Sequence, residues 1–468
     1  MSDQSTEPSA DTSDTGRAQA ASAAEVREHI TRLDAGLGFM ATTLPPASPR
    51  PTGPFAGEPL LVKDLDLKLA NTPLWRGNHV LREHRAVSSH DDPLGRRLRE
   101  LGFDIVGRTK SAEFGLAVTT EPFAYGPVRN PWDHERSAGG SSGGSACAVA
   151  ARAVRIAHGT DLGGSLRIPA AHCGVFALKP GLVRPPTTPT FEAWNQHGFL
   201  AGRVGDLRRV LRLLGQGEGQ GKGQSQPGRG EGQGEGQGKA SGTGRSGTDG
   251  PGRPLRVGVL ASAVSSAIDL GGDSVEVVQR MADKLSDQGH HVLPAHPRVL
   301  EQFDQFATKS LPVLAGWLAE EVADASKDLG RPLTEADMEP GTAQMLAMAA
   351  MATPEAVREV VQWLHRLVTD LTAWWEWFDV LLSPTVPVQA PRLGWLSDPD
   401  TAMRRTFGMM QYTAMFNASG QPAVNVPCVG SSGLPYGVQL VGAYGSEADL
   451  LDLAEQLSPE EAPIPPAA

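Results

Sequence analysis

The sequence contains little cysteine, and the spacing of the cysteines argues against two kinds of site. There are three in 468 residues, Cys147, Cys173 and Cys428, and none belongs to a CxxC pair. Neither a disulfide framework nor a zinc knuckle is therefore indicated. Each cysteine lies in an apolar stretch, so we predict buried, unreactive thiols of the kind found in a reducing cytoplasm.

Long apolar runs and a secretory pattern at the N-terminus are also missing. No run approaches the roughly 18 apolar residues that a membrane-spanning helix needs. The first residues, MSDQSTEPSADTSDTG, are polar and acidic. We therefore expect a cytoplasmic protein with no membrane partner.

Positive charge is scarcer than negative charge. The chain has 42 Lys and Arg against 53 Asp and Glu, a formal net charge of -11. Such a chain repels phosphate backbones, and its basic residues are dispersed rather than clustered. We expect no nucleic-acid partner.

Two segments almost lack large apolar side chains. Residues 1–23 are mainly Ser, Thr, Asp and Ala, and we predict a disordered tail there. Residues 215–254 alternate glycine with Gln, Glu and Lys, a composition that forms no apolar face and predicts a flexible insertion. Strand and helix patterns flank the insertion on both sides, so we predict that it interrupts one domain covering residues 24–468.

Elsewhere, short apolar runs alternate with helical patterns, which predicts an α/β sheet. Apolar residues three or four apart predict a first helix over residues 23–37. Strands are predicted at 60–62, 103–107, 255–260, 290–295, 379–387, 422–427 and 436–442, and helices at 92–102, 146–154, 273–289, 314–378 and 449–457.

Two glycine- and serine-rich clusters stand close together, GGSSGGSA at 139–146 and GTDLGGSLRIP at 159–169. The first directly precedes an apolar helix, whose N-terminus leaves N–H groups unpaired. It lacks the lysine of a phosphate loop, so nucleotide binding is unsupported. In the second cluster, four successive backbone N–H groups can point at one oxygen, as an oxyanion hole requires; they belong to Leu162, Gly163, Gly164 and Ser165.

A serine nucleophile needs a base, and the residues leave two candidates. His158 and His172 bracket Ser165, so a Ser–His arrangement stays open. Lys63 lies in PLLVKDLDL between apolar residues, where desolvation lowers the pKa of a lysine and lets the neutral amine accept a proton. Taken alone, this lysine is more readily explained by an ordinary ion pair with the aspartate that follows it.

Opposite charges flank the second cluster. Asp161 and Arg167 stand on either side of its central turn. An ion pair that holds the loop explains them better than a direct part in catalysis.

Together these motifs resemble the amidase signature family. The chain carries Lys63, the GGSS run beginning at Gly139, and a serine 24 residues after Ser141 within GTDLGGSLRIP. Further similarity lies in KDLDL, RTKSAEFG, GPVRNPWD, LLSPTVPV, FNASGQPAVNVP and LPYGVQLVG, so that it covers about residues 58–214 and 254–457.

The resemblance implies an α/β fold: a single domain with a large mixed β-sheet covered by helices on both faces. It implies Ser165 as the acyl-forming nucleophile, Ser141 as the relay after a cis peptide bond, and Lys63 as the base. No cofactor and no metal are implied. The remaining site assignments are supporting roles for Ser142, Asp161 and Arg167, and a pocket border that includes Thr119, Thr120 and Tyr125.

The implied activity is hydrolysis of linear carboxamide C–N bonds through a covalent acyl-enzyme. The expected partner is a small-molecule amide, and we allow for a homodimer. We expect helices from residues 261–380 to shape the pocket.

Two alternatives stay open. One is the glutaminase component of a tRNA-dependent amidotransferase, its A subunit, although Ile168 stands where such proteins commonly carry glutamine. The other is a non-catalytic scaffold of the same fold.

Overall fold

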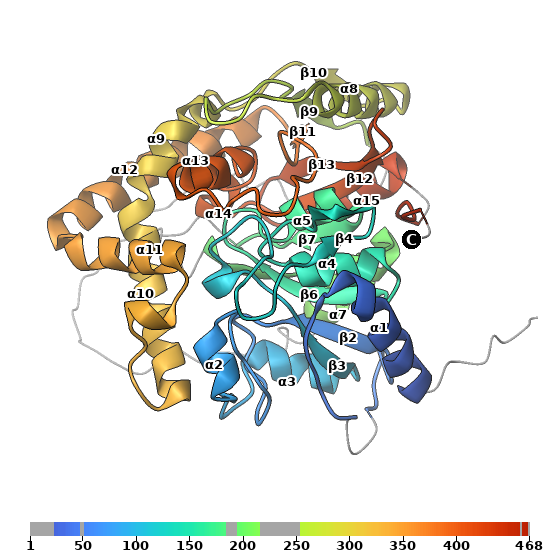
Figure 1. Ribbon diagram of the computed structural model, residues 1–468. Helices are drawn as coiled ribbons and strands as arrows, with labels where there is room; N and C mark the ends of the chain where they lie inside the picture. Colours follow the sequence, from blue (N-terminus) through green and yellow to red (C-terminus); the bar gives the residue numbers. More distant parts are fainter. Residues whose placement is uncertain (1–22, 47–50, 184–193, 216–252, 459–460, 467–468) are drawn as a thin grey trace, which may run out of the picture.

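A computed structural model describes residues 23–46, 51–183, 194–215, 253–458 and 461–466. The predicted tail at 1–23 and the predicted insertion at 215–254 lie almost entirely outside these residues. The strands before and after the insertion belong to the same sheet, so the described parts form one domain (Figure 1).

The centre of the molecule is an 11-stranded sheet of mixed direction. Its strands pair in the order β1-β3-β2-β6-β8-β7-β12-β13-β11-β9-β10. Strands β3, β2 and β6 run parallel, as do β11, β9 and β10, whereas the strands between these groups pair antiparallel. The bounds are β1 (Met40–Thr43), β2 (Pro59–Lys63), β3 (Asp104–Thr109), β6 (Ile156–Asp161), β7 (Phe176–Lys179), β8 (Gln196–Ala201), β9 (Arg256–Val259), β10 (His291–Leu293), β11 (Val380–Pro384), β12 (Ala423–Val429) and β13 (Pro435–Gly442), with β4 (Arg129–Asn130) and β5 (Asp133–Ser137) forming a separate hairpin.

Helices cover both faces of the sheet (Figure 1). Those labelled in the figure form one group around the strands and a second group, α9 to α12, that stands beside them. Their bounds are α1 (Ala23–Leu37), α2 (His79–Glu83), α3 (Pro93–Glu100), α4 (Gly143–Ala150), α5 (Arg167–Cys173), α7 (Val204–Gly215), α8 (Gly272–Asp287), α9 (Phe303–Lys309), α10 (Leu311–Leu329), α11 (Pro340–Met351), α12 (Pro354–Ala373), α13 (Pro399–Met409), α14 (Met415–Ala418) and α15 (Glu447–Leu457).

Alternation along the strands explains why both faces need cover. In β2, Leu60 and Val62 join a core that includes residues of α3, α7 and α15, whereas Leu61 joins a core with α1 and α4. Side chains of a strand alternate between faces, so a run of consecutive apolar residues is buried only when both faces are packed. The run LLV therefore specifies a central strand.

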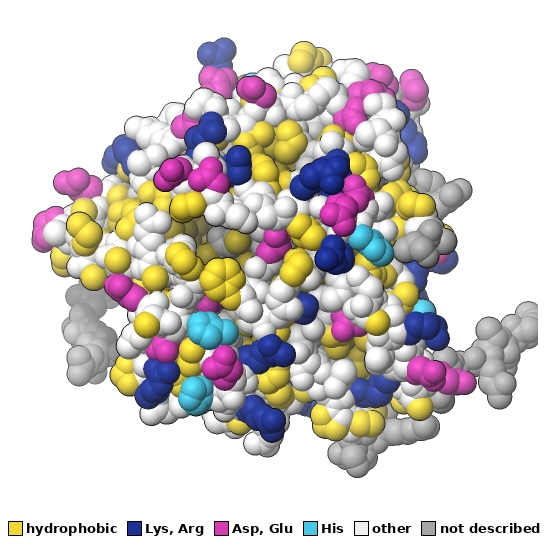
Figure 2. All heavy atoms as spheres, in the orientation of Figure 1, with side chains coloured by type: hydrophobic (Ala, Val, Ile, Leu, Met, Phe, Trp, Pro, Cys, Tyr) yellow, Lys and Arg dark blue, Asp and Glu magenta, His cyan; other side chains and the backbone are white. Residues whose placement is uncertain are grey.

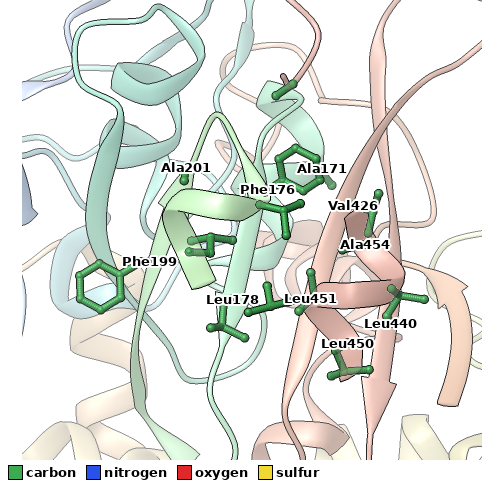
Figure 3. Close-up of a cluster of buried hydrophobic side chains, with 14 of the residues drawn as sticks. Ala171, Phe176, Leu178, Phe199, Ala201, Val426, Leu440, Leu450, Leu451 and Ala454 are labelled. Atoms are coloured by element: carbon green, nitrogen blue, oxygen red, sulfur yellow. The ribbon is translucent and has the colours of Figure 1, made fainter. Parts of the chain in front are cut away.

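The first of these cores joins strands that are far apart in the sequence (Figure 3). Phe176 of β7 and Phe199 of β8 belong to the same core as Leu440 of β13 and the apolar face of α15. Leu450 and Leu451, on that face, are both fully buried. This packing holds the middle of the sheet, at whose strand ends the glycine- and serine-rich motifs come together.

Most predicted elements are confirmed. The first helix has the predicted bounds, and the predicted strands at 103–107 and 436–442 appear as β3 and β13. The stretch predicted to be helical at 314–378 is divided into α10, α11 and α12. Gly330 ends α10 in a left-handed conformation, and Pro340 and Pro354 begin the next helices, because proline is well suited to a first helical position.

The sequence predicts no membrane-spanning segment. Among the described residues, no helix is long and apolar enough to cross a membrane.

Candidate active site

Lys63 is the last residue of β2, and its ammonium group is fully buried. Its Nζ donates to Ser141 Oγ over 2.7 Å and to Thr160 Oγ1 over 3.0 Å. Burial lowers the pKa of Lys63 to about 8, although the nearby carboxylates of Asp66 and Asp161 act against this. About a tenth of this amine is therefore neutral at pH 7, and about half at pH 8.

The alternative of an ordinary ion pair with the next residue does not hold. Asp64 is buried, but it accepts hydrogen bonds from Trp75 N–H (2.8 Å) and from the hydroxyl of Tyr125 (2.6 Å). Lys63 makes no salt bridge within the described chain. Its contacts are hydroxyl groups, which suits a base better than an ion pair.

Ser141 follows a cis peptide bond, Gly140–Ser141, as predicted. A Cβ on Gly140 would come within 2.5 Å of the Thr119 carbonyl oxygen, so the backbone passes this point only as glycine. Ser141 Oγ accepts the hydrogen bond from Lys63 Nζ. The chain then enters α4, whose residues are all buried.

Ser165 lies on the turn between β6 and α5 and is partly exposed, unlike Ser141 and Lys63. Its carbonyl oxygen accepts a hydrogen bond from Ser142 N–H over 3.1 Å. Ser142 also donates its hydroxyl to the Thr160 carbonyl over 3.1 Å. Ser142 therefore ties the Ser165 turn to the segment that carries Ser141 and to the strand that carries Thr160.

Asp161 and Arg167 form a fully buried ion pair, which agrees with the prediction that they hold the loop. Arg167 donates from Nη2 to Asp161 Oδ1 (2.8 Å) and from Nε to Asp161 Oδ2 (2.9 Å). Burial alone would raise the pKa of Asp161, but the guanidinium beside it holds that pKa well below its usual range. Both side chains are sealed from solvent, so the pair is structural.

The oxyanion donors differ from the prediction at one position. Gly164 N–H donates to Asp161 Oδ1 over 2.7 Å, so it is not free to hold an oxyanion. Gly164 has a φ of +130°, and a Cβ there would meet Thr413 Oγ1 at 2.4 Å, so this residue shapes the turn instead. The N–H groups of Leu162, Gly163 and Ser165 meet no acceptor in the described structure and stay the predicted donors.

His158 and His172, the two candidate partners in a Ser–His arrangement, do not bind either serine of the site in the described structure. His158 and His172 are both fully buried, and burial lowers the pKa of each, that of His172 to about 4. His158 Nε2 lies 3.0 Å from His197 Nδ1. In the part of the chain that the structure describes, no hydrogen bond joins either imidazole to Ser141 or Ser165.

A cavity of about 500 Å³ opens in front of Ser165. Leu162, Gly163 and Ser165 form part of its wall, and the loop from Thr119 to Phe123 forms another part. Figure 2 shows hydrophobic side chains gathered near the middle of this face of the molecule. Further wall residues come from α9 to α11 and from the chain around α13, with Phe306, Ser310, Leu314, Thr342, Gln344, Met345, Met403, Phe407 and Met410.

This wall confirms that the region 261–380 shapes the pocket, but the contribution of residues 394–414 had no recognised signal in the sequence. Of the three predicted border residues, Thr119 lines the cavity. Thr120 instead donates to the Gly139 carbonyl (2.8 Å), and Tyr125 binds Asp64. Thr160 was also missed as a partner of Lys63, although it stands in the GTDLGGS motif that drew attention to its neighbours.

Comparison with known proteins agrees with this geometry. A family model described as Amidase matches residues 40–451. A 6-aminohexanoate-cyclic-dimer hydrolase of Pseudomonas sp. (strain NK87) is 36% identical over 426 residues, covering 87% of this chain and 83% of the relative. A solved structure of 6-aminohexanoate cyclic dimer hydrolase complexed with substrate has 32% identity and a TM-score of 0.80, covering 93% of this chain and 92% of that one. The A subunit of a glutamyl-tRNA(Gln) amidotransferase from Methanococcoides burtonii is 29% identical over 430 residues, covering 86% of this chain and 84% of the relative.

Fold and relatives together define an enzyme of the hydrolase class that acts on amide bonds. Within that class, the chain belongs to the amidase family. The 6-aminohexanoate-cyclic-dimer hydrolases act on a cyclic amide, so the expectation of a linear substrate is too narrow for these relatives.

Proposed function

We propose that this chain hydrolyses a small amide through an acyl-enzyme on Ser165, with Ser141 as the proton relay and Lys63 as the base. The observation that carries the proposal is the 2.7 Å contact between Lys63 Nζ and Ser141 Oγ in a fully buried setting. A neutral lysine accepts the Ser141 proton and keeps its own N–H on Thr160 Oγ1.

Each proton in this scheme has a destination. Ser165 Oγ attacks the amide carbonyl carbon and passes its proton to Ser141 Oγ, whose own proton moves to Lys63. The N–H groups of Leu162, Gly163 and Ser165 stabilise the oxyanion. The C–N bond then breaks, and the proton returns through Ser141 to the leaving nitrogen. Water then attacks the acyl carbon and gives a proton through Ser141 to Lys63. The bond from this carbon to Ser165 Oγ breaks, that oxygen takes the proton back, and the carboxylic acid leaves.

The cavity supports an uncharged, largely aliphatic amide group. Its wall is mostly apolar and includes Leu314, Met345 and Met410. The relatives hydrolyse a cyclic dimer of 6-aminohexanoate, which has this character. We therefore propose aliphatic amides of ω-amino acids, cyclic or linear, as the substrate class.

The glutaminase alternative is less well supported. Glutamine carries an α-carboxylate, which needs a cationic partner when it leaves water. Among the described residues that line the cavity, none is Lys, Arg or His. Ile168, fully buried in α5, also stands where the amidotransferase proteins commonly carry glutamine.

Labelling with a fluorophosphonate, read by intact-mass spectrometry, tests the nucleophile and the base. We expect one adduct on the wild type, none on Ser165→Ala, and labelling slowed about 10²-fold or more in Lys63→Ala because the base is lost. Release of linear product from 6-aminohexanoate cyclic dimer, followed by liquid chromatography, tests the substrate class.

Labelling that persists in Ser165→Ala would contradict the assigned nucleophile. A folded wild type that takes up no label, beside a control amidase that does, would favour the scaffold alternative. Ser431→Ala is a suitable control, because Ser431 is exposed and its hydroxyl donates to Asp273, away from the cavity wall.

A further inference from the structure

The cavity in front of Ser165 has a one-sided charge. Three carboxylate side chains, Glu113, Glu121 and Glu339, belong to its wall. The described residues of that wall include no basic side chain to balance them. A pocket lined by one sign of charge attracts ligands of the opposite sign.

Of these three, Glu113 is buried and hydrogen-bonded through both oxygens, whereas Glu339 keeps one oxygen without a protein partner in the described structure. Glu339 stands directly before α11 and is only partly buried. Its Oε1 accepts the Phe123 N–H over 2.7 Å, which ties the side chain from its own helix to the Thr119–Phe123 loop. Its Oε2 has no partner in the described structure, so one oxygen is anchored and the other is open.

A second carboxylate, that of Glu113, lies close to Glu339 and carries charge of the same sign. Glu113 is 3% exposed. Its Oε1 accepts Asn78 Nδ2 (2.8 Å), and its Oε2 accepts the Glu339 N–H (2.9 Å). The hydrogen-bonding capacity of Glu113 is thus used to hold the start of α11, while its charge adds to the negative potential at Glu339.

Burial, followed by the charge of Glu113, raises the pKa of Glu339 to about 7. The charged group acting on Glu339 is Glu113, whose own pKa is raised by burial although its hydrogen bonds and His79 act against this. A cation bound at Glu339 would relieve this repulsion. Phe123, whose backbone N–H binds Glu339, is 70% exposed and belongs to the cavity wall, and an aromatic ring can bind a cation on its face.

We propose that Glu339 is the specificity residue of this enzyme and binds a protonated amino group of the substrate, with the Phe123 ring beside it. This inference rests on the proposed amide hydrolysis at Ser165. Within the proposed class it adds a preference for amides that carry a protonated amino group over uncharged ones such as the cyclic dimer, and it disfavours amides that end in a carboxylate.

Binding to the Ser165→Ala variant tests this without turnover. Three anilides that differ only at the chain end are compared by calorimetry: 6-aminohexananilide (ammonium), heptananilide (methyl) and heptanedioic acid monoanilide (carboxylate). We expect the ammonium compound to bind at least about tenfold more tightly than the methyl compound, and the carboxylate compound to bind most weakly, since charge-assisted hydrogen bonds are the strong ones.

Glu339→Gln in the same background should abolish this preference, because glutamine keeps an oxygen for the Phe123 N–H but carries no charge. Glu335→Gln, an exposed glutamate outside the cavity wall, should leave the preference unchanged. The preference should also shrink as the pH falls below about 7, where Glu339 becomes protonated.

Equal binding of the ammonium and methyl compounds, or a preference that survives Glu339→Gln, would overturn the assignment of Glu339. Fluorophosphonate labelling of Ser165 tests the chemistry separately and is measured in the wild type and in Glu339→Gln. If the wild type takes up no label, the result counts against the proposed function and not against the charge preference.

Discussion

The protonation state of a single buried amine sets the conditions under which this site can react. Lys63 must be neutral to take the Ser141 proton, and its pKa of about 8 lies well below the ordinary lysine value. We therefore expect kcat/KM to rise with pH below about 8 and to level off above it. A pH–rate profile between about pH 6 and 9.5 measures this.

Lys63→Arg is the informative variant for this prediction. Arginine keeps its charge over the whole range and cannot act as the base, so we expect no pH at which activity returns. A wild-type profile that is flat over that range, or an active Lys63→Arg enzyme, would contradict the role of Lys63.

At the scale of elements, the Asp161–Arg167 pair joins parts of the chain that are distant in sequence. Arg167 begins α5 and donates to the Thr413 carbonyl (3.2 Å), to Asn417 Oδ1 (2.6 Å) and to Gln439 Oε1 (2.6 Å). Asp161, at the end of β6, holds the Ser165 turn through the N–H groups of Gly164 and Leu166. A buried charge network thus fixes the turn.

Removing one partner of this pair should therefore be costly. We expect Asp161→Asn to lose about 3–5 kcal/mol of unfolding free energy at pH 7, because Arg167 is left buried and unpaired. The folded pKa of Asp161 is depressed, so its stabilisation is complete above the unfolded value of about 3.9. It is lost as the pH falls toward the folded value.

Urea unfolding at about pH 7 and about pH 3 measures this difference, which should be smaller at the lower pH. Asp452→Asn is the matched control, because Asp452 pairs with Arg208 in a solvent-exposed setting and should cost less than about 1 kcal/mol. Equal losses in the two variants would show that the buried network is not what holds the turn.

At the scale of the whole molecule, the apolar cores share strands. In β11, Leu382 joins the core packed by α8 and α15, and its neighbour Leu381 joins the core packed by α9, α10 and α12. Both side chains are fully buried. Two cores that meet on one strand should unfold together, so the helical group beside the sheet is not an independent unit.

We expect one calorimetric transition for the protein, shifted down by Leu381→Ala and by Leu382→Ala alike. Each substitution should cost about 2–5 kcal/mol, as is typical of a leucine removed from a packed core. Two resolved transitions, with each variant moving a different one, would contradict a shared core. The homodimer stays a prediction, which sedimentation of the same protein would test.

The local elements were largely readable from the sequence because each is specified by its own residues. The run LLV before Lys63 predicts a strand, and β2 is that strand, which the structure buries on both faces. Apolar spacing predicts the bounds of α1. The glycine–serine motifs predict where the backbone must turn sharply, and the resemblance they carry predicts the cis bond before Ser141.

The sequence by itself thus determined the α/β character, the burial of Lys63 and the motifs that bring Ser141 and Ser165 to the site. Tertiary structure alone decided what those motifs contact. In the folded chain, Gly164 N–H donates to Asp161 and does not point into the cavity as a free donor. Glu113 accepts the Glu339 N–H although 226 residues separate the two. The physical reason is that a strand or turn follows from short-range periodicity and backbone limits, whereas the charge of a pocket depends on which distant segments pack against it.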